Sequence, residues 1–247
     1  MAKIKKHKKL VIGLSITGGV LLSCFVAFSI YCGIYNHATD NALTYLKDSS
    51  NSTVKDEKSY VTFTPKENSK DSGLIFYPGG KVDYKAYAPF LRDLSDSGYG
   101  SVLVKMPLNL AVFKPNGADG KQALIPSISH WYISGHSLGG AMTCSYLGSH
   151  QSEYDGVILL AAYSTVDLTG DSSFKSLSLL AENDKVLNWN KYESSKKNLP
   201  NLTEVTIKGG IHSYFGDYGI QRKDGTPTIT VEEQRKEVVS SIVSFLS

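Results

Sequence analysis

Residues Leu10 to Tyr35 form a continuous stretch of 26 residues without a charged side chain. A helix needs ~20 predominantly apolar residues to cross the hydrocarbon core of a bilayer, so this stretch is long enough to span one. The globular part of the chain is therefore expected after it. The sequence divides into a basic tail at 1–9, a transmembrane anchor at 10–35, a linker at 36–58 and a globular domain at 59–247.

Five of the 26 basic residues precede the apolar stretch, and the segment after it mixes acidic and basic residues. Basic residues beside a membrane span favour the cytoplasmic side. We therefore expect a single-pass protein of the cell membrane with a cytoplasmic N-terminus and an extracellular domain. The five residues are Lys3, Lys5, Lys6, Lys8 and Lys9.

The N-terminal stretch has two alternative interpretations. A cleaved secretory signal peptide has an apolar region of only ~7 to 15 residues, which is shorter than this one. The sequence Leu21 to Cys24 resembles a bacterial lipoprotein cleavage site, but the chain stays apolar from Phe25 to Tyr35. The length of the stretch favours an uncleaved anchor.

The rest of the chain is nearly neutral, with 21 basic and 23 acidic residues once the five N-terminal lysines are set aside. Nucleic-acid binding requires a concentrated basic surface, so nucleic acid is excluded as a partner. Of three cysteines only Cys144 falls in the domain, so no disulfide can form within it. The hydrophobic core must stabilise the domain, and Cys144 is expected to pack as a small apolar residue.

From Tyr60 onward, short apolar runs alternate with amphipathic stretches. This alternation is typical of βαβ units and predicts an α/β fold with a mostly parallel sheet flanked by helices. Residues 36–58 are rich in Ser, Asn, Asp and Lys, which indicates a linker. The predicted strands are 74–77, 101–104, 130–134, 157–162, 176–181 and 204–207, and the predicted helices are 84–94, 139–147 and 230–246.

The chain contains one G-x-S-x-G sequence, Gly135 to Gly139. In enzymes with this pattern at a strand-to-helix turn, the serine has a strained backbone conformation, and a Cβ at either glycine would collide with the neighbouring elements. Here an apolar strand precedes the motif and a predicted helix follows it. This context favours Ser137 as a nucleophile over a purely structural turn.

A serine nucleophile needs a general base, and chains with this turn place the serine first, the acid second and the histidine last. His212 lies in a Gly-rich loop after the last predicted strand. The other five histidines lie in the N-terminal segments, before or beside Ser137, or at the end of the helix that follows it. Elimination and chain order therefore assign His212 as the base. The excluded residues are His7, His37, His130, His136 and His150.

The acid that orients the histidine should lie in a loop at the carboxyl end of a strand. Asp184 follows the predicted strand 176–181 after a two-residue turn and is the preferred candidate. Asp167, after the preceding strand, is the better substitute, and Glu182 is a further alternative. Each of these carboxylates could equally be a solvated loop residue.

The oxyanion of an acyl-transfer reaction needs two backbone N–H donors. One comes from the residue after the nucleophile, which is Leu138, and the other from the loop after an early strand. In that loop Gly80 is the preferred donor and Lys81 the next, because glycines allow a backbone amide to approach the substrate. An ordinary Pro-Gly turn is the alternative.

These candidates lie within four motifs that follow one another along the chain. The motifs are Tyr77-Pro78-Gly79-Gly80-Lys81-Val82-Asp83-Tyr84, Lys105-Met106-Pro107, Gly135-His136-Ser137-Leu138-Gly139-Gly140, and His212 with Phe215, Gly216, Tyr218, Gly219 and Gln221.

Together the motifs resemble a group of short bacterial α/β hydrolases that are similar to carboxymethylenebutenolidase, the dienelactone-hydrolase branch. The resemblance covers roughly Tyr60 to Ser247. It implies an α/β-hydrolase fold, a triad of Ser137, Asp184 and His212, and neither a metal nor another cofactor. The dienelactone hydrolases themselves use a cysteine nucleophile, so their lactone substrate does not carry over to this chain.

We therefore expect a serine hydrolase that cleaves an ester, thioester or amide bond. Its substrate would be a small molecule or an acylated component of the cell envelope. The short segment from Ala162 to Ser176 leaves no room for a large lid, so a shallow, open pocket is expected. Two alternatives remain, namely acyl transfer to an envelope acceptor and a catalytically silent binding module on the same scaffold.

Overall fold

The computed structural model describes residues 2–247, with side chains described for residue 17 and from residue 19 onward. The chain divides into two compact units, Met1–Tyr35 and Asn36–Ser247. The first holds helix α1 (Ala2–Gly33). Among the residues that the structure describes, no helix is long and apolar enough to cross a membrane. Residues 10–16 and 18 of the predicted anchor lie outside the residues whose side chains are described.

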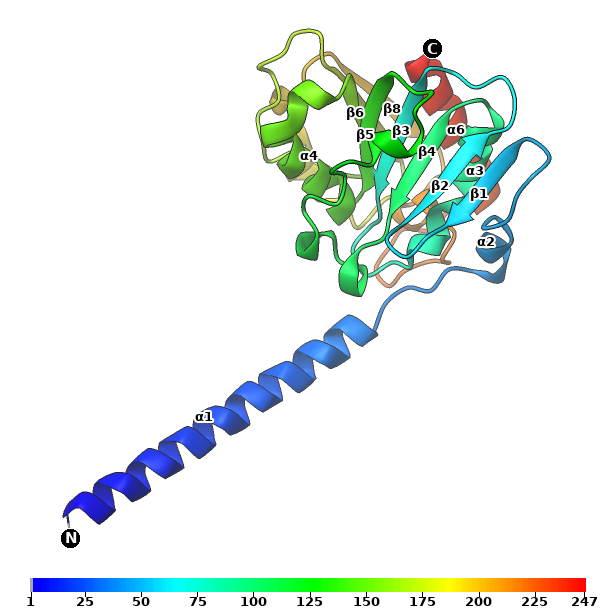
Figure 1. The fold of residues 1–247 in the computed structure, drawn as a ribbon. Coiled ribbons are helices and arrows are strands. Elements are labelled where there is room, and N and C mark those ends of the chain that lie inside the picture. The colour runs from blue at the N-terminus through cyan, green and yellow to red at the C-terminus, as the bar shows by residue number, and fades with distance from the viewer. Residues whose placement is uncertain (1) are drawn as a thin grey trace. The chain divides into compact units, whose positions relative to one another are not determined.

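The second unit is built on an eight-stranded sheet with the order β1-β2-β4-β3-β5-β6-β7-β8 (Figure 1). The two strands at one edge run antiparallel to their neighbours, and all other neighbouring pairs are parallel. The predicted, mostly parallel sheet is therefore confirmed. The strands are β1 (Ser52–Asp56), β2 (Tyr60–Pro65), β3 (Ser72–Tyr77), β4 (Gly100–Val104), β5 (His130–His136), β6 (Gly156–Leu160), β7 (Lys175–Ala181) and β8 (Leu202–Ile207).

Helices cover both faces of this sheet. On one face α3 (Ala88–Asp96) and α6 (Val231–Leu246) pack against one set of strand residues. On the other face α4 (Leu138–His150) packs against the alternate set. The remaining helices are α2 (Asp40–Thr44) and α5 (Trp189–Ser195), with 3₁₀ turns at η1 (Tyr84–Tyr87), η2 (Pro107–Asn109), η3 (Ala111–Phe113), η4 (Gln122–Leu124), η5 (Gln151–Glu153), η6 (Lys196–Asn198) and η7 (His212–Phe215).

The central strands are buried on both faces, which explains why they appear in the sequence as continuous apolar runs. In β3, for example, Leu74 and Phe76 face the α3 and α6 side, whereas Ile75 and Tyr77 face α4. All six residues of β3 are buried. Because successive side chains of a strand point to opposite faces, one strand contributes to both core layers.

The prediction that residues 36–58 form a linker is wrong, because this segment folds as part of the second unit. It contains α2 and β1, and β1 pairs with β2. The Ser52 hydroxyl is buried against the side chains of Ser95 and Asp96. An edge strand exposes much of its surface, so β1 needs few apolar residues and its polar composition resembles that of a linker.

Candidate active site

Ser137 occupies the sharp turn between β5 and α4, where it is the N-cap of the helix. Its backbone angles are φ 52° and ψ −120°, a conformation that non-glycine residues rarely adopt and that is typical of a strained functional turn. The Ser137 N–H donates to the carbonyl of Leu160 at 2.9 Å, which joins the turn to the end of β6. The side chain is half-buried, so its hydroxyl is within reach of solvent and substrate.

The glycines of the motif are required by backbone packing. A Cβ added at Gly139 would lie 2.3 Å from the carbonyl oxygens of both Tyr77 and Pro78. A Cβ at Gly135 would lie 2.5 Å from backbone atoms of Gly139 and Gly140. Because backbone atoms cannot move aside as a flexible side chain can, any larger residue at either position would displace the turn.

His212 begins the 3₁₀ turn η7 after β8, and its ring is hydrogen-bonded to Asp184 in the loop after β7. The distance from His212 Nδ1 to Asp184 Oδ2 is 2.7 Å, and both side chains are buried. The other oxygen of Asp184 accepts the backbone N–H groups of Val186 and Leu187, at 2.7 and 2.8 Å. This carboxylate is therefore fixed at both oxygens and holds the His212 ring in one orientation.

The alternative acids are engaged elsewhere. Asp167 is exposed, and its Oδ1 accepts hydrogen bonds from the backbone and hydroxyl of Thr169. These two bonds lower the pKa of Asp167. Glu182 accepts the N–H of Gly209 at 2.8 Å. The structure thus brings Asp184, and neither substitute, to His212.

The other histidines of the second unit that were excluded as bases lie in different surroundings. His130 is exposed, with its Nδ1 3.2 Å from Asp155. His150 stacks on Tyr146 with ring centres 4.1 Å apart. His136 is fully buried beside the candidate site, and its ring centre lies 4.5 Å from that of His212. The residue before Ser137 therefore packs directly against the candidate base.

His136 belongs to a buried hydrogen-bonded chain that the sequence did not reveal. Its Nδ1 lies 2.8 Å from the hydroxyl of Tyr87, which also accepts the N–H of Gly79 at 2.9 Å. The Tyr87 hydroxyl accepts the Gly79 N–H and keeps its own proton available for donation to His136 Nδ1. Burial, followed by the nearby His212, lowers the pKa of His136 well below its ordinary value. His136 is therefore neutral beside the candidate base.

The hydrogen bonds of the loop after β3 determine which of its amides is available as an oxyanion donor. The Gly79 N–H is bonded to Tyr87, and the Lys81 N–H donates to the carbonyl of Asn109 at 2.7 Å. The Gly80 N–H has no acceptor among the described residues. A Cβ at Gly80 would lie 2.7 Å from Cδ2 of Leu138, so the two predicted oxyanion donors belong to adjacent residues in space. Lys81, the second candidate, has its amide occupied.

The N-terminal amides of α4 are available as well. The first intrahelical bond runs from the Ala141 N–H to the Ser137 carbonyl, at 3.1 Å. The amides before it, including that of Leu138, lack a partner within the helix. They form a positively polarised helix end beside the Ser137 side chain, which suits a developing negative charge.

Two further carboxylates that the sequence analysis missed hold the loop around His212. Asp224 accepts the N–H of Ser213 at 2.7 Å and that of His212 at 3.4 Å. Asp217 accepts the hydroxyl of Thr39 at 2.8 Å and the side-chain amide of Asn41 at 2.7 Å. Asp217 contacts residues that are distant in sequence, whereas Asp224 bonds within its own segment, and no local motif marks either residue.

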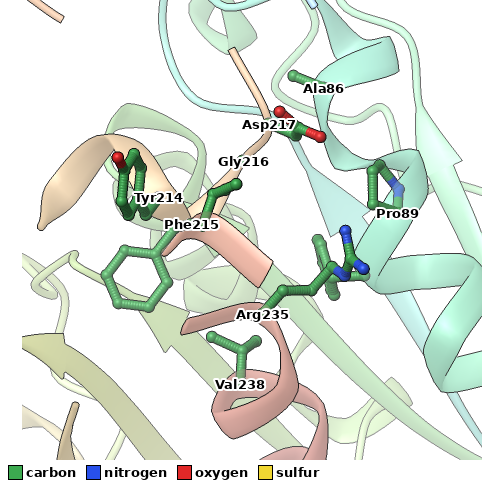
Figure 2. Close-up of a pocket in the computed structure, with 10 residues that line it drawn as sticks. Ala86, Pro89, Tyr214, Phe215, Gly216, Asp217, Arg235 and Val238 are labelled. Atoms are coloured by element: carbon green, nitrogen blue, oxygen red, sulfur yellow. The ribbon is translucent and has the colours of Figure 1, made fainter. Parts of the chain in front are cut away.

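A small pocket lies behind this loop, between η1, α3 and α6 (Figure 2). Asp217 and Arg235 are at its edge, and Phe215 and Val238 contribute apolar surface. None of the three triad candidates lines it. This pocket is therefore separate from the arrangement around Ser137.

Cys144 lies in α4 and is fully buried, as the sequence analysis expected. Burial raises the pKa of its thiol to about 12. A thiol rather than a thiolate is therefore present at neutral pH, and thiols are poor nucleophiles. Within the described residues no group of three or more His, Cys, Asp or Glu side chains is arranged to hold a metal.

Comparison with solved structures gives many matches at low sequence identity. Carboxyl esterase 2 of the mycorrhizal fungus Tuber melanosporum has a TM-score of 0.61 at 12% identity, covering 84% of this chain and 89% of that one. A bacterial heroin esterase has a TM-score of 0.61 at 13% identity, covering 83% and 88%. An esterase of Pyrobaculum calidifontis has a TM-score of 0.57 at 14% identity, covering 83% and 89%. At such identities the similarity shows the fold.

No curated protein matches the sequence. A family model described as the alpha/beta hydrolase family matches residues 73–236, which is well over half of the chain. The matched region runs from β3 to α6 and includes Ser137, Asp184 and His212. The chain therefore belongs to the alpha/beta hydrolase family.

Proposed function

We propose that the protein is a serine hydrolase that cleaves ester-type acyl bonds through Ser137, His212 and Asp184. The observation that carries the proposal is the buried hydrogen bond between His212 and Asp184, at 2.7 Å, beside a serine in a strained strand-to-helix turn. The solved structures named above are esterases, which supports the ester among the possible acyl bonds.

In this proposal Asp184 accepts the Nδ1–H of His212, which leaves the Nε2 lone pair free to take the Ser137 proton. The serine oxygen then bonds to the carbonyl carbon, and the carbonyl electrons move to the oxygen. The amides of Gly80 and Leu138 stabilise this oxyanion. Collapse of the intermediate expels the alcohol, which receives the proton from His212.

The second half of the reaction repeats these steps with water in place of the serine. His212 removes a proton from water, the hydroxide attacks the acyl-enzyme, and Ser137 leaves with the proton returned. No group other than these side chains and amides is needed for the proton balance. The charge that develops on His212 is adjacent to His136, whose neutrality avoids a repulsion between two imidazolium rings.

We further propose that residues 10–35 anchor this enzyme in the cell membrane and that the catalytic unit lies outside the cell. The 26 uncharged residues and the five lysines before them support this topology. The short segment from Ala162 to Ser176, which leaves no room for a large lid, supports an open site for small or surface-presented acyl substrates. Protease treatment of intact cells tests the topology, since an extracellular unit would be released and a cytoplasmic one would be protected.

A fluorophosphonate probe on the full chain tests the chemistry. We expect the probe to label Ser137 in the native chain and to leave Ser137→Ala unlabelled. The native chain without probe should hydrolyse a short-chain acyl ester. Ser145, an exposed serine of α4, provides a matched control, because Ser145→Ala should keep both labelling and turnover. Turnover that survives in Ser137→Ala contradicts the proposal. Product formed only with an added acyl acceptor would instead establish a transferase.

A further inference from the structure

The exposed apolar side chains of the second unit are unevenly distributed. Seven large hydrophobic residues between Asn36 and Ser247 are exposed. Six of them lie in the segments that follow the carboxyl ends of β4, β7 and β8, including the start of α5, and the seventh, Leu43, lies in α2. The six residues, which we call the apolar rim, are Leu108, Val112, Phe113, Val186, Trp189 and Ile220.

The apolar rim surrounds the proposed active site. The strands β3 to β8 are parallel, so their carboxyl ends meet at one edge of the sheet. Ser137, Asp184 and His212 follow three of these strand ends. The rim residues occupy the loops of the same edge, and no large hydrophobic residue is exposed in the described loops of the opposite edge. Single exposed apolar residues are ordinary, whereas a gathering around one site indicates a partner.

Basic side chains accompany the rim. Lys185 precedes Val186, and Arg222 and Lys223 follow Ile220 in the loop after β8. All three are exposed, and none forms an ion pair within the described part of the chain. Apolar side chains interspersed with lysine and arginine are typical of surfaces that bind a lipid interface with anionic headgroups.

Carboxylates also lie at this edge, and they keep their negative charge while they accept hydrogen bonds from within the protein. Glu182 accepts a hydrogen bond from the Gly209 N–H, and Asp167 accepts one from the Thr169 hydroxyl. Asp119 accepts one from the Tyr146 hydroxyl at 2.9 Å. Each therefore has a hydrogen-bond donor within the protein. Among the described residues, Lys185, Arg222 and Lys223 have no such partner, so their charges can face an anionic surface.

The point at which the chain enters the second unit lies at the same edge. Asn36 donates its N–H to the Lys81 carbonyl at 2.8 Å and accepts the Asp83 N–H at 2.9 Å. It pairs with Val82 as a short parallel bridge. The first residue after the proposed membrane anchor is thus hydrogen-bonded to the loop that carries Gly80.

We infer that the apolar rim contacts the lipid bilayer and that the substrate is an acyl ester presented at the bilayer surface. This inference rests on the proposed hydrolase function and names its substrate class. Bilayer contact buries apolar surface that water would otherwise hydrate, and the three basic residues meet anionic headgroups. An ester bond in the headgroup layer can then reach Ser137 while its lipid stays in the bilayer.

Tryptophan fluorescence tests the contact independently of activity. The chain has two tryptophans: Trp131 is buried in the core, and Trp189 belongs to the rim. The full chain is reconstituted into vesicles of phosphatidylcholine and phosphatidylglycerol, with and without acyl-chain bromination. We expect brominated lipid to quench the emission, and this loss to disappear in Trp189→Phe. Emission that brominated lipid leaves unchanged overturns the inference.

Activity on two substrates tests the consequence. The rim variant Val112→Ser, Phe113→Ser, Ile220→Ser should hydrolyse a long-chain ester embedded in vesicles about tenfold more slowly than the native chain, because three apolar contacts are lost. Its rate on a water-soluble acetate ester should stay within about twofold, since none of the three residues belongs to the proposed catalytic groups. Leu43→Ser, which removes the exposed hydrophobic residue outside the rim, should leave both rates unchanged.

Equal rates of the rim variant and the native chain on the vesicle ester would overturn the inference. A parallel loss on the soluble ester would do so as well, because it would place the defect in catalysis rather than in lipid contact. The failure of the proposed function looks different. In that case the native chain hydrolyses neither ester, while the quenching of Trp189 still decides whether the rim meets lipid.

Discussion

His212 and Asp184 meet through a single buried contact, with Nδ1 of the histidine 2.7 Å from Oδ2 of the aspartate. The second oxygen of Asp184 is held by two backbone N–H groups of its own loop. The carboxylate is therefore held by its own loop as well as by the histidine, which lies 28 residues later in the sequence. The two backbone bonds restrict the aspartate side chain and so reduce the entropy that its pairing with the histidine costs.

Asp184→Asn should lower kcat by about 10⁴-fold, because an asparagine cannot hold the required tautomer of His212. Asp167→Asn should leave kcat nearly unchanged, since Asp167 is exposed and bonded to Thr169. Steady-state kinetics on a soluble ester compares the two variants. Equal losses, or a larger loss in Asp167→Asn, would move the acid to the loop after β6.

Tyr87→Phe should destabilise the protein by about 1 to 3 kcal/mol, because it leaves the Gly79 N–H and His136 Nδ1 buried without a partner. Tyr84→Phe is the matched control. Its hydroxyl lies 3.4 Å from Asp56 at an exposed position, so a change below about 0.5 kcal/mol is expected. Urea unfolding gives the stability of both variants. A similar free energy of unfolding for the two would mean that the buried hydrogen bonds of Tyr87 contribute little to stability.

The stability should depend on pH through His136. The folded state holds the pKa of His136 well below 6.5, so below that pH the unfolded chain binds a proton that the native chain does not. The free energy of unfolding therefore falls as the pH decreases from about 6.5, by up to about 1.4 kcal/mol per pH unit, and His136 contributes no slope above this range. His136→Asn should show a shallower decline between about pH 6.5 and 5. Parallel curves for the variant and the native chain would rule out His136 as the source.

The parts of this fold that the sequence predicted are those with strong local patterns. The five strands β3 to β7 are buried on both faces and appear as apolar runs, whereas β1 and β2 at one side of the sheet have a mixed pattern. Ser137 is marked by its glycines. Tyr87 and Asp217 could not be found in this way, because their roles depend on contacts between segments that are distant in sequence.

Gly139→Ala should cost about 3 kcal/mol or more, because the added Cβ would lie 2.3 Å from two backbone oxygens at the end of β3. Gly148→Ala in the same helix is the control. There the Cβ would lie 3.1 Å from Cγ1 of Val166, a side-chain atom that can shift, and alanine favours the helix. Thermal unfolding of both variants is the measurement. A Gly139→Ala protein as stable as the control would mean that the turn can relax.

Asn36 is the first residue of the second unit, and its hydrogen bonds with Lys81 and Asp83 join it to the loop after β3. Helix α1 ends at Gly33, so a proteolytic cut between Gly33 and Asn36 would release the second unit with these hydrogen bonds intact. A cut only a few residues later would also remove the Thr39 hydroxyl that holds Asp217. For the tethered hydrolase that we propose, the three residues from Asn36 to Thr39 thus separate the release of a diffusible enzyme from the release of a damaged one.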